Sequence, residues 1–297
     1  LRVREVLQLR PFPLASALLA LAPCLSWFPP SARGKPLREG PLQMELLSEN
    51  LSIAPGEPFY VGWRIHRDAG WHTYWKHPGD VGVPPFLEWK LPQGFSAGEL
   101  RFPPPERIKM ATVSAHGHKG ETLFLAKITP PAKLKPGTEL ALKAKASWLT
   151  CSKQCCPGFL DLSLALPVET KARFCSDEKK RFAAARASWP RKLVGWKVRA
   201  LDYGESLELL LSPPEGRPVT SPPRNLHFFG EGNLVRSDRP QVATVGEGIL
   251  RIRLVRAEWA PAAAAALAGL VYAEEGWNGK DSPRFARVEA RLESPPK

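Results

Sequence analysis

Short runs of alternating apolar and polar residues, separated by turns rich in proline and glycine, constrain the fold of this chain more than any other feature. Alternation places every second side chain on one face of a strand, and many short strands joined by such turns are typical of a β-sandwich. The 32 prolines and the scarcity of helical periodicity favour the same class. We therefore predict a mainly β fold, with a first domain over residues 40–170 and strands near 43–53, 59–65, 86–89, 123–128, 139–149 and 159–167.

A different pattern begins at Ser176. A serine N-cap, an acidic first turn and an alanine-rich body up to Ser188, stopped by Pro190, predict a helix. We interpret residues 171–190 as a helical connector. Residues 191–294 are predicted to form a second, smaller β-rich domain, with strands near 196–211, 225–229, 249–255 and 285–292 and one helix near 260–267.

The amino terminus has the layout of a secretory signal peptide, because Arg2, Arg4 and Arg10 precede the short apolar run 13–22. We predict a signal peptide over residues 1–33 and export to an oxidising compartment, where disulfides form and persist. The run is shorter than the span of about 20 apolar residues that a bilayer requires, and no later segment reaches that length. Pro23 directly before Cys24 argues against a lipid anchor at that cysteine.

The excess of basic residues, 42 Lys and Arg against 29 Asp and Glu, raises the question of nucleic-acid binding. The charges are scattered along the chain without a basic run or a stacking motif. We therefore interpret the excess as a solvated basic surface and predict no nucleic-acid partner.

Three of the five cysteines, Cys151, Cys155 and Cys156, fall where a strand-like run breaks into the turn Pro157-Gly158. Structural disulfides usually close long loops, since these remove more entropy from the unfolded chain. A Cys151–Cys155 bridge closes only a small ring and contributes little stability, which favours a thiol pair retained for its chemistry. The alternative is an inert structural disulfide.

The extra cysteines leave several pairings open. Cys156 is either a spare thiol or a partner for Cys175, which would leave Cys151 and Cys155 as the working pair. A bridge between the adjacent Cys155 and Cys156 would strain the intervening peptide and is the least favoured.

Two long motifs resemble the amino-terminal periplasmic domain of DsbD/ScsB-type thiol–disulfide interchange proteins. One is Trp71–Pro84 followed by Leu87-Glu88-Trp89, and the other is Trp148-Leu149-Thr150-Cys151 with Cys155, Pro157 and Gly158. Two further segments, 225–229 and 270–277, are similar to the second domain of the ScsB-like branch.

This resemblance implies an immunoglobulin-like periplasmic domain that carries reducing equivalents without a cofactor, as a component of a protein-disulfide reductase. Electrons would come from a membrane-embedded donor of the DsbD/CcdA type and pass to thioredoxin-like periplasmic proteins or disulfide isomerases. The chain has no transmembrane or carboxy-terminal thioredoxin-like segment, so we expect the donor to be a separate protein. By the same resemblance, Cys155 is the nucleophile that faces the partner and Cys151 is the resolving thiol.

His116-Gly117-His118 resembles the position of an aromatic cap loop that shields the cysteine pair in this family, with histidines replacing the aromatic residues. The alternative interpretation is a solvated glycine-rich turn. Soft thiolates near imidazoles also suit copper(I) or zinc, so a metal-binding or structural binding module on the same scaffold is the rival function. That site would combine His116 and His118 with Cys151, Cys155 and Cys156.

The Trp71–Pro84 motif itself is interpreted as architectural. Its aromatic residues are expected to pack against the sandwich, and Gly79 and Gly82 suit a tight turn with positive φ. His72 and Asp80 are a conceivable catalytic pair, but such residues more often satisfy backbone groups in loops.

Overall fold

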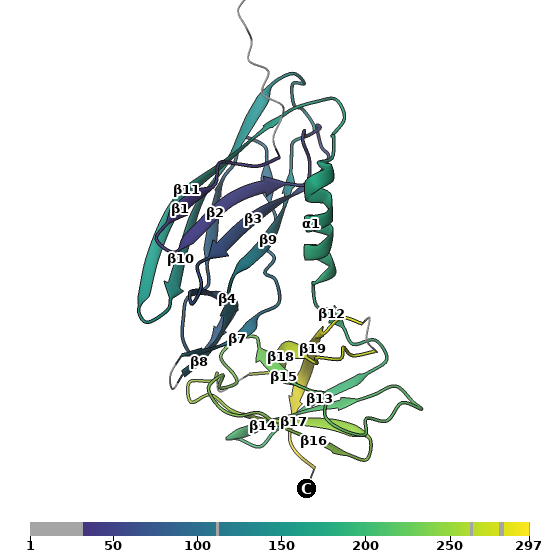
Figure 1. Cartoon of the computed structure of the whole chain (residues 1–297). Coiled ribbons are helices and arrows are strands. Elements are labelled where there is room, and N and C mark those ends of the chain that lie inside the picture. The colour runs from purple at the N-terminus through teal and green to yellow at the C-terminus, as the bar shows by residue number, and fades with distance from the viewer. Residues whose placement is uncertain (1–31, 111–112, 262–263, 279–281, 297) are drawn as a thin grey trace, which may run out of the picture.

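The computed structural model describes residues 32–110, 113–261, 264–278 and 282–296, and it is mainly β (Figure 1). The predicted signal peptide, with Cys24, lies almost entirely outside the described residues. The amino-terminal half, which we call the sandwich, consists of two antiparallel sheets. The first sheet has the order β1-β2-β3-β9-β6, with bounds Leu37–Glu39, Leu42–Ser48, Phe59–Arg67, Glu121–Thr129 and Ser96–Ala97, respectively.

The second sheet has the order β11-β10-β4-β8-β7, with β5 paired to β10 beside β4. Its strands are β11 (Cys155–Pro167), β10 (Glu139–Cys151), β4 (His72–Gly79), β8 (Val113–His118), β7 (Glu106–Met110) and β5 (Phe86–Lys90). The long hairpin β10–β11 runs the length of this sheet, and its tip carries the cysteine cluster.

The alternation of β10 shows why the two sheets stack. Leu142, Ala144, Ala146 and Trp148 are buried against the first sheet, whereas Lys143 and Lys145 between them are exposed. Residues of β2, β3 and β9 supply the opposite side of the same core, including Trp63 and Phe124. The β-sandwich predicted from the sequence is therefore confirmed.

The helix α1 (Ser176–Ala187) covers the outer face of the first sheet. Phe182 is its apolar anchor and packs on Leu47 and Leu125. The helix was predicted, but its N-cap is Cys175 rather than Ser176, and Cys175 makes no side-chain cap hydrogen bond.

The carboxy-terminal sheet, β12–β19, has the order β15-β18-β19-β13-β14-β17-β16, with β12 paired to β19. Its bounds are β12 (Arg191–Lys192), β13 (Lys197–Asp202), β14 (Ser206–Ser212), β15 (His227–Gly230), β16 (Val242–Gly246), β17 (Ile249–Val255), β18 (Ala266–Tyr272) and β19 (Phe285–Glu293). One apolar core contains residues of β13, β14 and β17 together with residues of β15, β18 and β19.

The helix predicted near 260–267 is wrong. Residues 260, 261, 264 and 265 are not helical, and strand β18 begins at Ala266. The alanine-rich run suggested helix propensity, but β18 pairs along its whole length with β19, for example Leu267 with Ala290. Tertiary pairing has overridden local preference here.

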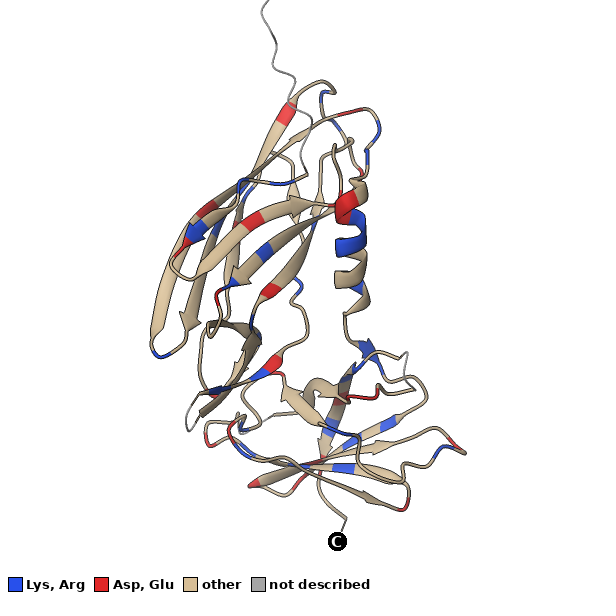
Figure 2. Ribbon diagram, in the orientation of Figure 1, with Lys and Arg blue, Asp and Glu red and all other residues tan. Residues whose placement is uncertain are grey.

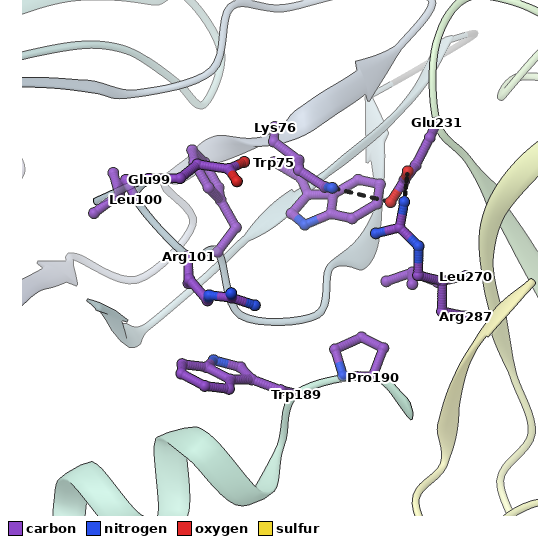
Figure 3. A pocket seen from close by; sticks show the side chains of 11 residues that line it. Trp75, Lys76, Glu99, Leu100, Arg101, Trp189, Pro190, Glu231, Leu270 and Arg287 are labelled. Atoms are coloured by element: carbon purple, nitrogen blue, oxygen red, sulfur yellow. Dashed lines mark hydrogen bonds and ion pairs between the residues drawn. The ribbon is translucent and has the colours of Figure 1, made fainter. Parts of the chain in front are cut away.

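The carboxy-terminal sheet lies against the end of the sandwich formed by β4, β7 and β8 (Figure 1). An apolar cluster of Trp75, Phe229 and Leu270 forms part of this junction. Beside it, Glu231 bridges Lys76 of the sandwich at 2.9 Å and Arg287 of β19 at 3.0 Å (Figure 3).

Charged residues of both signs are interspersed over the sandwich and the carboxy-terminal sheet (Figure 2). Many are paired, such as Arg256 with Asp202 at 2.6 Å. This distribution agrees with a solvated basic surface rather than a single basic face. Within the described ranges, no helix has the length and hydropathy required to cross a bilayer.

Candidate functional site

Cys151 and Cys155 form a disulfide at the tip of the β10–β11 hairpin. Cys151 ends β10, Cys155 begins β11, and they are cross-strand partners with Cα atoms 4.1 Å apart. The intervening turn is exposed and is closed by a hydrogen bond from the Ser152 amide to the Gln154 carbonyl at 3.0 Å. The pair predicted from the sequence is thus bridged, whereas Cys156 and Cys175 are free thiols.

The two bridged cysteines differ in exposure. Cys151 is only 1% exposed, whereas Cys155 lies on the surface. An incoming thiolate must approach a disulfide along the line of the S–S bond, from the side opposite the leaving sulfur. The arrangement therefore favours attack at Cys155, with Cys151 as the leaving sulfur.

Tyr74 is the polar contact of the buried sulfur. Its hydroxyl donates a hydrogen bond to Cys151 Sγ at 3.1 Å and lies 3.9 Å from Cys155 Sγ. Burial raises the pKa of Tyr74, so the hydroxyl keeps its proton and remains a donor. Sequence reasoning interpreted Tyr74 as a packing residue, because the contact joins positions 77 residues apart.

A turn between β4 and β5 covers the Tyr74 ring. Gly82 has φ +110°, and a Cβ atom there would lie 2.2 Å from the ring, so the main chain lies directly on the aromatic face. Val81 packs on the cluster formed by Tyr74, Ile108, Ala115 and Cys151. This turn, rather than the predicted histidine segment, covers the cluster that contains the buried cysteine.

His72 stands beside the site without a catalytic partner among the described contacts. Its ring meets Tyr74 edge to face with centroids 5.4 Å apart, and its carbonyl accepts a hydrogen bond from Thr150 Oγ1 at 2.9 Å. Burial, together with the charges of Lys119 and Arg67, lowers the pKa of His72 to about 4. The imidazole is therefore neutral near pH 7, and the hydrogen bonds of Asp80 lead to Ser237 and Asp238 instead.

The segment His116-Gly117-His118 is not a loop but the end of strand β8, paired with both β4 and β7. Ala115 belongs to the cysteine cluster, so the alternating His116 and His118 side chains face the other way. His116 packs on Phe229 with ring centroids 4.9 Å apart, and His118 packs on Phe124 with ring centroids 5.4 Å apart. The expected cap loop is thus corrected to a buried strand.

The same placement removes the basis of the rival metal site. A ring nitrogen of His116 bonds the His77 carbonyl at 3.3 Å, and one of His118 bonds the Pro103 carbonyl at 3.2 Å. Burial lowers the pKa of His116 to about 4 and that of His118 to about 3. Among the described residues, no group of three or more His, Cys, Asp or Glu side chains is arranged to hold a metal.

An exposed apolar strip continues from the disulfide along the outer face of the hairpin. Pro157 and Phe159 follow Cys155 on the same face of β11, because side chains alternate. Phe86 of β5 and Phe159 flank Ser147 in one cross-strand row, and their side chains are 62% and 63% exposed. The exposed apolar side chains therefore lie on the same face of the hairpin as Cys155.

Part of the chain matches a known protein family, and the fold is similar to that of a solved structure. Residues 43–167 match the family described as thiol:disulfide interchange protein DsbD, N-terminal. The fold is similar to the crystal structure of the N-terminal periplasmic domain of ScsB from Proteus mirabilis, with TM-score 0.61, 18% sequence identity and coverage of 89% of this chain and 100% of that chain. A conserved domain protein from Bacillus anthracis gives TM-score 0.26 at 9% identity, covering 86% of this chain and 88% of that one. No curated protein sequence matches the chain.

Proposed function

We propose that this chain is a periplasmic carrier of reducing equivalents that uses Cys151 and Cys155, because residues 43–167 match the DsbD N-terminal family of thiol–disulfide interchange proteins. The single observation that carries the proposal is the asymmetric disulfide, in which Cys155 is an exposed residue and Cys151 is buried in contact with Tyr74. An inert structural bridge requires neither an accessible sulfur nor a polar donor on its partner.

In the reductive half-reaction, a thiolate of the donor attacks Cys155 Sγ. The Cys151–Cys155 bond breaks, a mixed disulfide forms, and Cys151 leaves as a thiolate that accepts the Tyr74 hydrogen bond. The donor's second thiolate then attacks its own bridged sulfur and releases Cys155. Two electrons and two protons reach the Cys151–Cys155 pair, and the donor dithiol becomes a disulfide.

The oxidative half-reaction reverses these roles. The Cys155 thiolate attacks the disulfide of an oxidised acceptor, and one acceptor sulfur leaves as a thiolate. Cys151 then attacks Cys155 Sγ, which re-forms the intramolecular bridge and releases the acceptor as a dithiol. Burial of Cys151 keeps this resolving thiol away from other proteins while it remains within reach of Cys155.

The donor in this proposal is a membrane-embedded protein of the DsbD/CcdA type, and the acceptors are thioredoxin-like proteins or disulfide isomerases. The family resemblance supports both assignments, as well as the periplasmic location. Residues 40–170 would be the interchange domain, residues 171–190 the connector and residues 191–294 a second domain. The chain would act as a protein-disulfide reductase component.

The test is a trapping experiment with an oxidised thioredoxin-like protein. A Cys151→Ser variant should hold it as a stable mixed disulfide through Cys155, because the resolving thiol is gone. Cys156→Ser is included in all variants, since the neighbouring free thiol could otherwise resolve the complex. The matched Cys155→Ser variant, which leaves only the buried Cys151, should trap little or none.

A redox titration of the wild-type chain completes the test. In dithiothreitol buffers of decreasing potential, the Cys151–Cys155 bridge should open while the β-sheet circular-dichroism signal is retained. A bridge that stays closed until the protein unfolds would contradict the carrier function.

A further inference from the structure

Asp80 joins the cover of the disulfide to the carboxy-terminal sheet. Its Oδ2 atom accepts hydrogen bonds from the amides of Ser237 and Asp238 at 2.8 and 3.0 Å. The Ser237 hydroxyl lies 2.9 Å from the same oxygen and accepts a bond from the Asp80 amide at 3.1 Å. Ser237 is only 2% exposed, whereas Asp80 lies at the surface, so these bonds join an exposed carboxylate to a buried serine.

Ser237 also contacts the strand beneath the site. Its hydroxyl lies 2.7 Å from the Ser114 carbonyl, and its single proton serves either this oxygen or Asp80. Ser114 precedes Ala115, which belongs to the cysteine cluster and pairs with Gly79. The same serine therefore contacts both β4, at Gly79, and β8, at Ser114.

The local sequence is adapted to this contact. Gly79 has φ +86°, and a Cβ atom there would lie 2.4 Å from Ser237 Oγ. Only glycine permits that approach at this conformation. Three residues later, Gly82 lies directly on the Tyr74 ring. The turn 79–82 is thus held at one end by Ser237 and rests at the other end on the residue that contacts Cys151.

We propose that Asp80 and Ser237 are positioning residues for disulfide exchange: through the turn 79–82 they hold the Tyr74 hydroxyl on Cys151 Sγ. The carboxy-terminal sheet then has a definite part in the chemistry, since it fixes the donor that stabilises the leaving thiolate. This inference rests on the proposed function, because it concerns the rate of the same exchange step.

The test measures reduction of the disulfide by dithiothreitol in the full chain. Asp80→Asn and Ser237→Ala each weaken the Asp80–Ser237 contact, one from each side. Both should slow reduction by about threefold to tenfold. This is the effect expected when one hydrogen bond to a charged group is partly formed in the transition state. In the reduced protein, both should also speed alkylation of Cys151, because the cover is looser.

A double-variant comparison separates positioning from general destabilisation. If Asp80 acts through Tyr74, then Asp80→Asn should slow reduction little further when Tyr74→Phe is already present. Additive slowing would overturn the proposal. Glu231→Gln is the matched control, because it breaks the Lys76–Glu231–Arg287 bridge at another point of the same junction and should leave the reduction rate unchanged.

The outcomes distinguish this inference from the proposed function. A wild-type bridge that dithiothreitol cannot open would contradict the carrier itself. A bridge that opens at equal rates in wild type, Asp80→Asn and Ser237→Ala would contradict only the positioning role. Equal slowing by Glu231→Gln would also overturn it, because the effect would then belong to the whole junction.

Discussion

The hydroxyl of Tyr74 donates a hydrogen bond to Cys151 Sγ at 3.1 Å, from a ring that is itself buried. The donor is of greatest value when Cys151 carries negative charge, because hydrogen bonds to charged acceptors are about twice as strong as neutral ones. Tyr74 thus favours the state in which the S–S bond has just broken. It also offsets part of the cost of burying a thiolate.

Replacing Tyr74 by Phe should therefore slow reduction of the disulfide. The ring and its contact with Gly82 are retained, and only the donor is lost. We expect a decrease of about threefold to tenfold in the rate with dithiothreitol, since the hydrogen bond acts partly in the transition state. Stopped-flow reduction measures it. Tyr60→Phe is the control, because Tyr60 packs on Trp189 away from the sulfurs, and an equal loss there would refute the role of Tyr74.

The sheets of this protein could be predicted because their signal is local. Along β10 the alternation of Leu142, Lys143, Ala144 and Lys145 directly reports which side chains face the core. The Cys151–Cys155 pair is local for the same reason, since both residues belong to one hairpin. Strands β4, β7 and β8 of the second sheet were missed. In β8 a His-Gly-His segment lacks strand propensity and becomes a strand through pairing on both sides.

The surroundings of the sulfurs could not be predicted, because they are long-range contacts. Tyr74 meets Cys151 across the second sheet, and Asp80 meets Ser237 across 157 positions in the chain. The motif containing both residues was recognised, and the glycines were correctly expected at positive φ. Which partners these residues have depends on how the sheets pack, and alternation carries no information about that.

Substituting Gly82 by Ala should destabilise the fold and disturb the site. The φ of +110° disfavours any side chain, and the new methyl group would overlap the Tyr74 ring. We expect a loss of about 2 kcal/mol or more in the free energy of unfolding, from strain and overpacking together. Gly120→Ala is the control, since its φ is +56° and nothing lies within 4 Å of the added Cβ, so only about 1 kcal/mol should be lost. Equal losses in urea unfolding would contradict the close contact.

The buried histidines predict a loss of stability in mild acid. Burial lowers the pKa of His72 and His116 to about 4 and that of His118 and His227 to about 3, from an ordinary value of 6.5. As the pH falls below about 6.5, the unfolded chain binds protons that the folded chain does not, so the free energy of unfolding decreases, by up to about 1.4 kcal/mol per pH unit for each such group.

Urea unfolding between pH 7 and 5 measures this slope, in a range above the ordinary pKa values of the carboxylates. A His227→Phe variant should show a shallower slope, because one histidine with a lowered pKa is removed. The variant should fold, since His227 packs on Phe229 in aromatic surroundings that accommodate a phenyl ring. Lys143→Met, which removes an exposed charge on β10 without removing a histidine, should keep the wild-type slope. A slope of zero in the wild type would show that the imidazoles can be protonated in the folded protein.

The exposed rings Phe86 and Phe159 should matter to protein partners and not to small thiols. Phe159 is four residues from Cys155 along β11, a distance of about 13 Å, whereas an interface of about 800 Å² per partner extends roughly 16 Å from its centre. A protein whose interface is centred on Cys155 would therefore reach this strip. Phe159→Ser should weaken exchange with a thioredoxin-like protein by about tenfold, the loss expected for removing one interfacial aromatic ring.

The same variant should be reduced by dithiothreitol at the wild-type rate, because a small thiol contacts only the sulfur. Val194→Ser is the control for loss of exposed apolar surface, since Val194 is 79% exposed and lies next to β12, away from the hairpin. It should leave both rates unchanged. Phe159→Ser could instead slow reduction by dithiothreitol and exchange with the protein partner equally. That result would show that the ring supports the hairpin rather than the interface, and that partners approach Cys155 from the side of the turn 79–82.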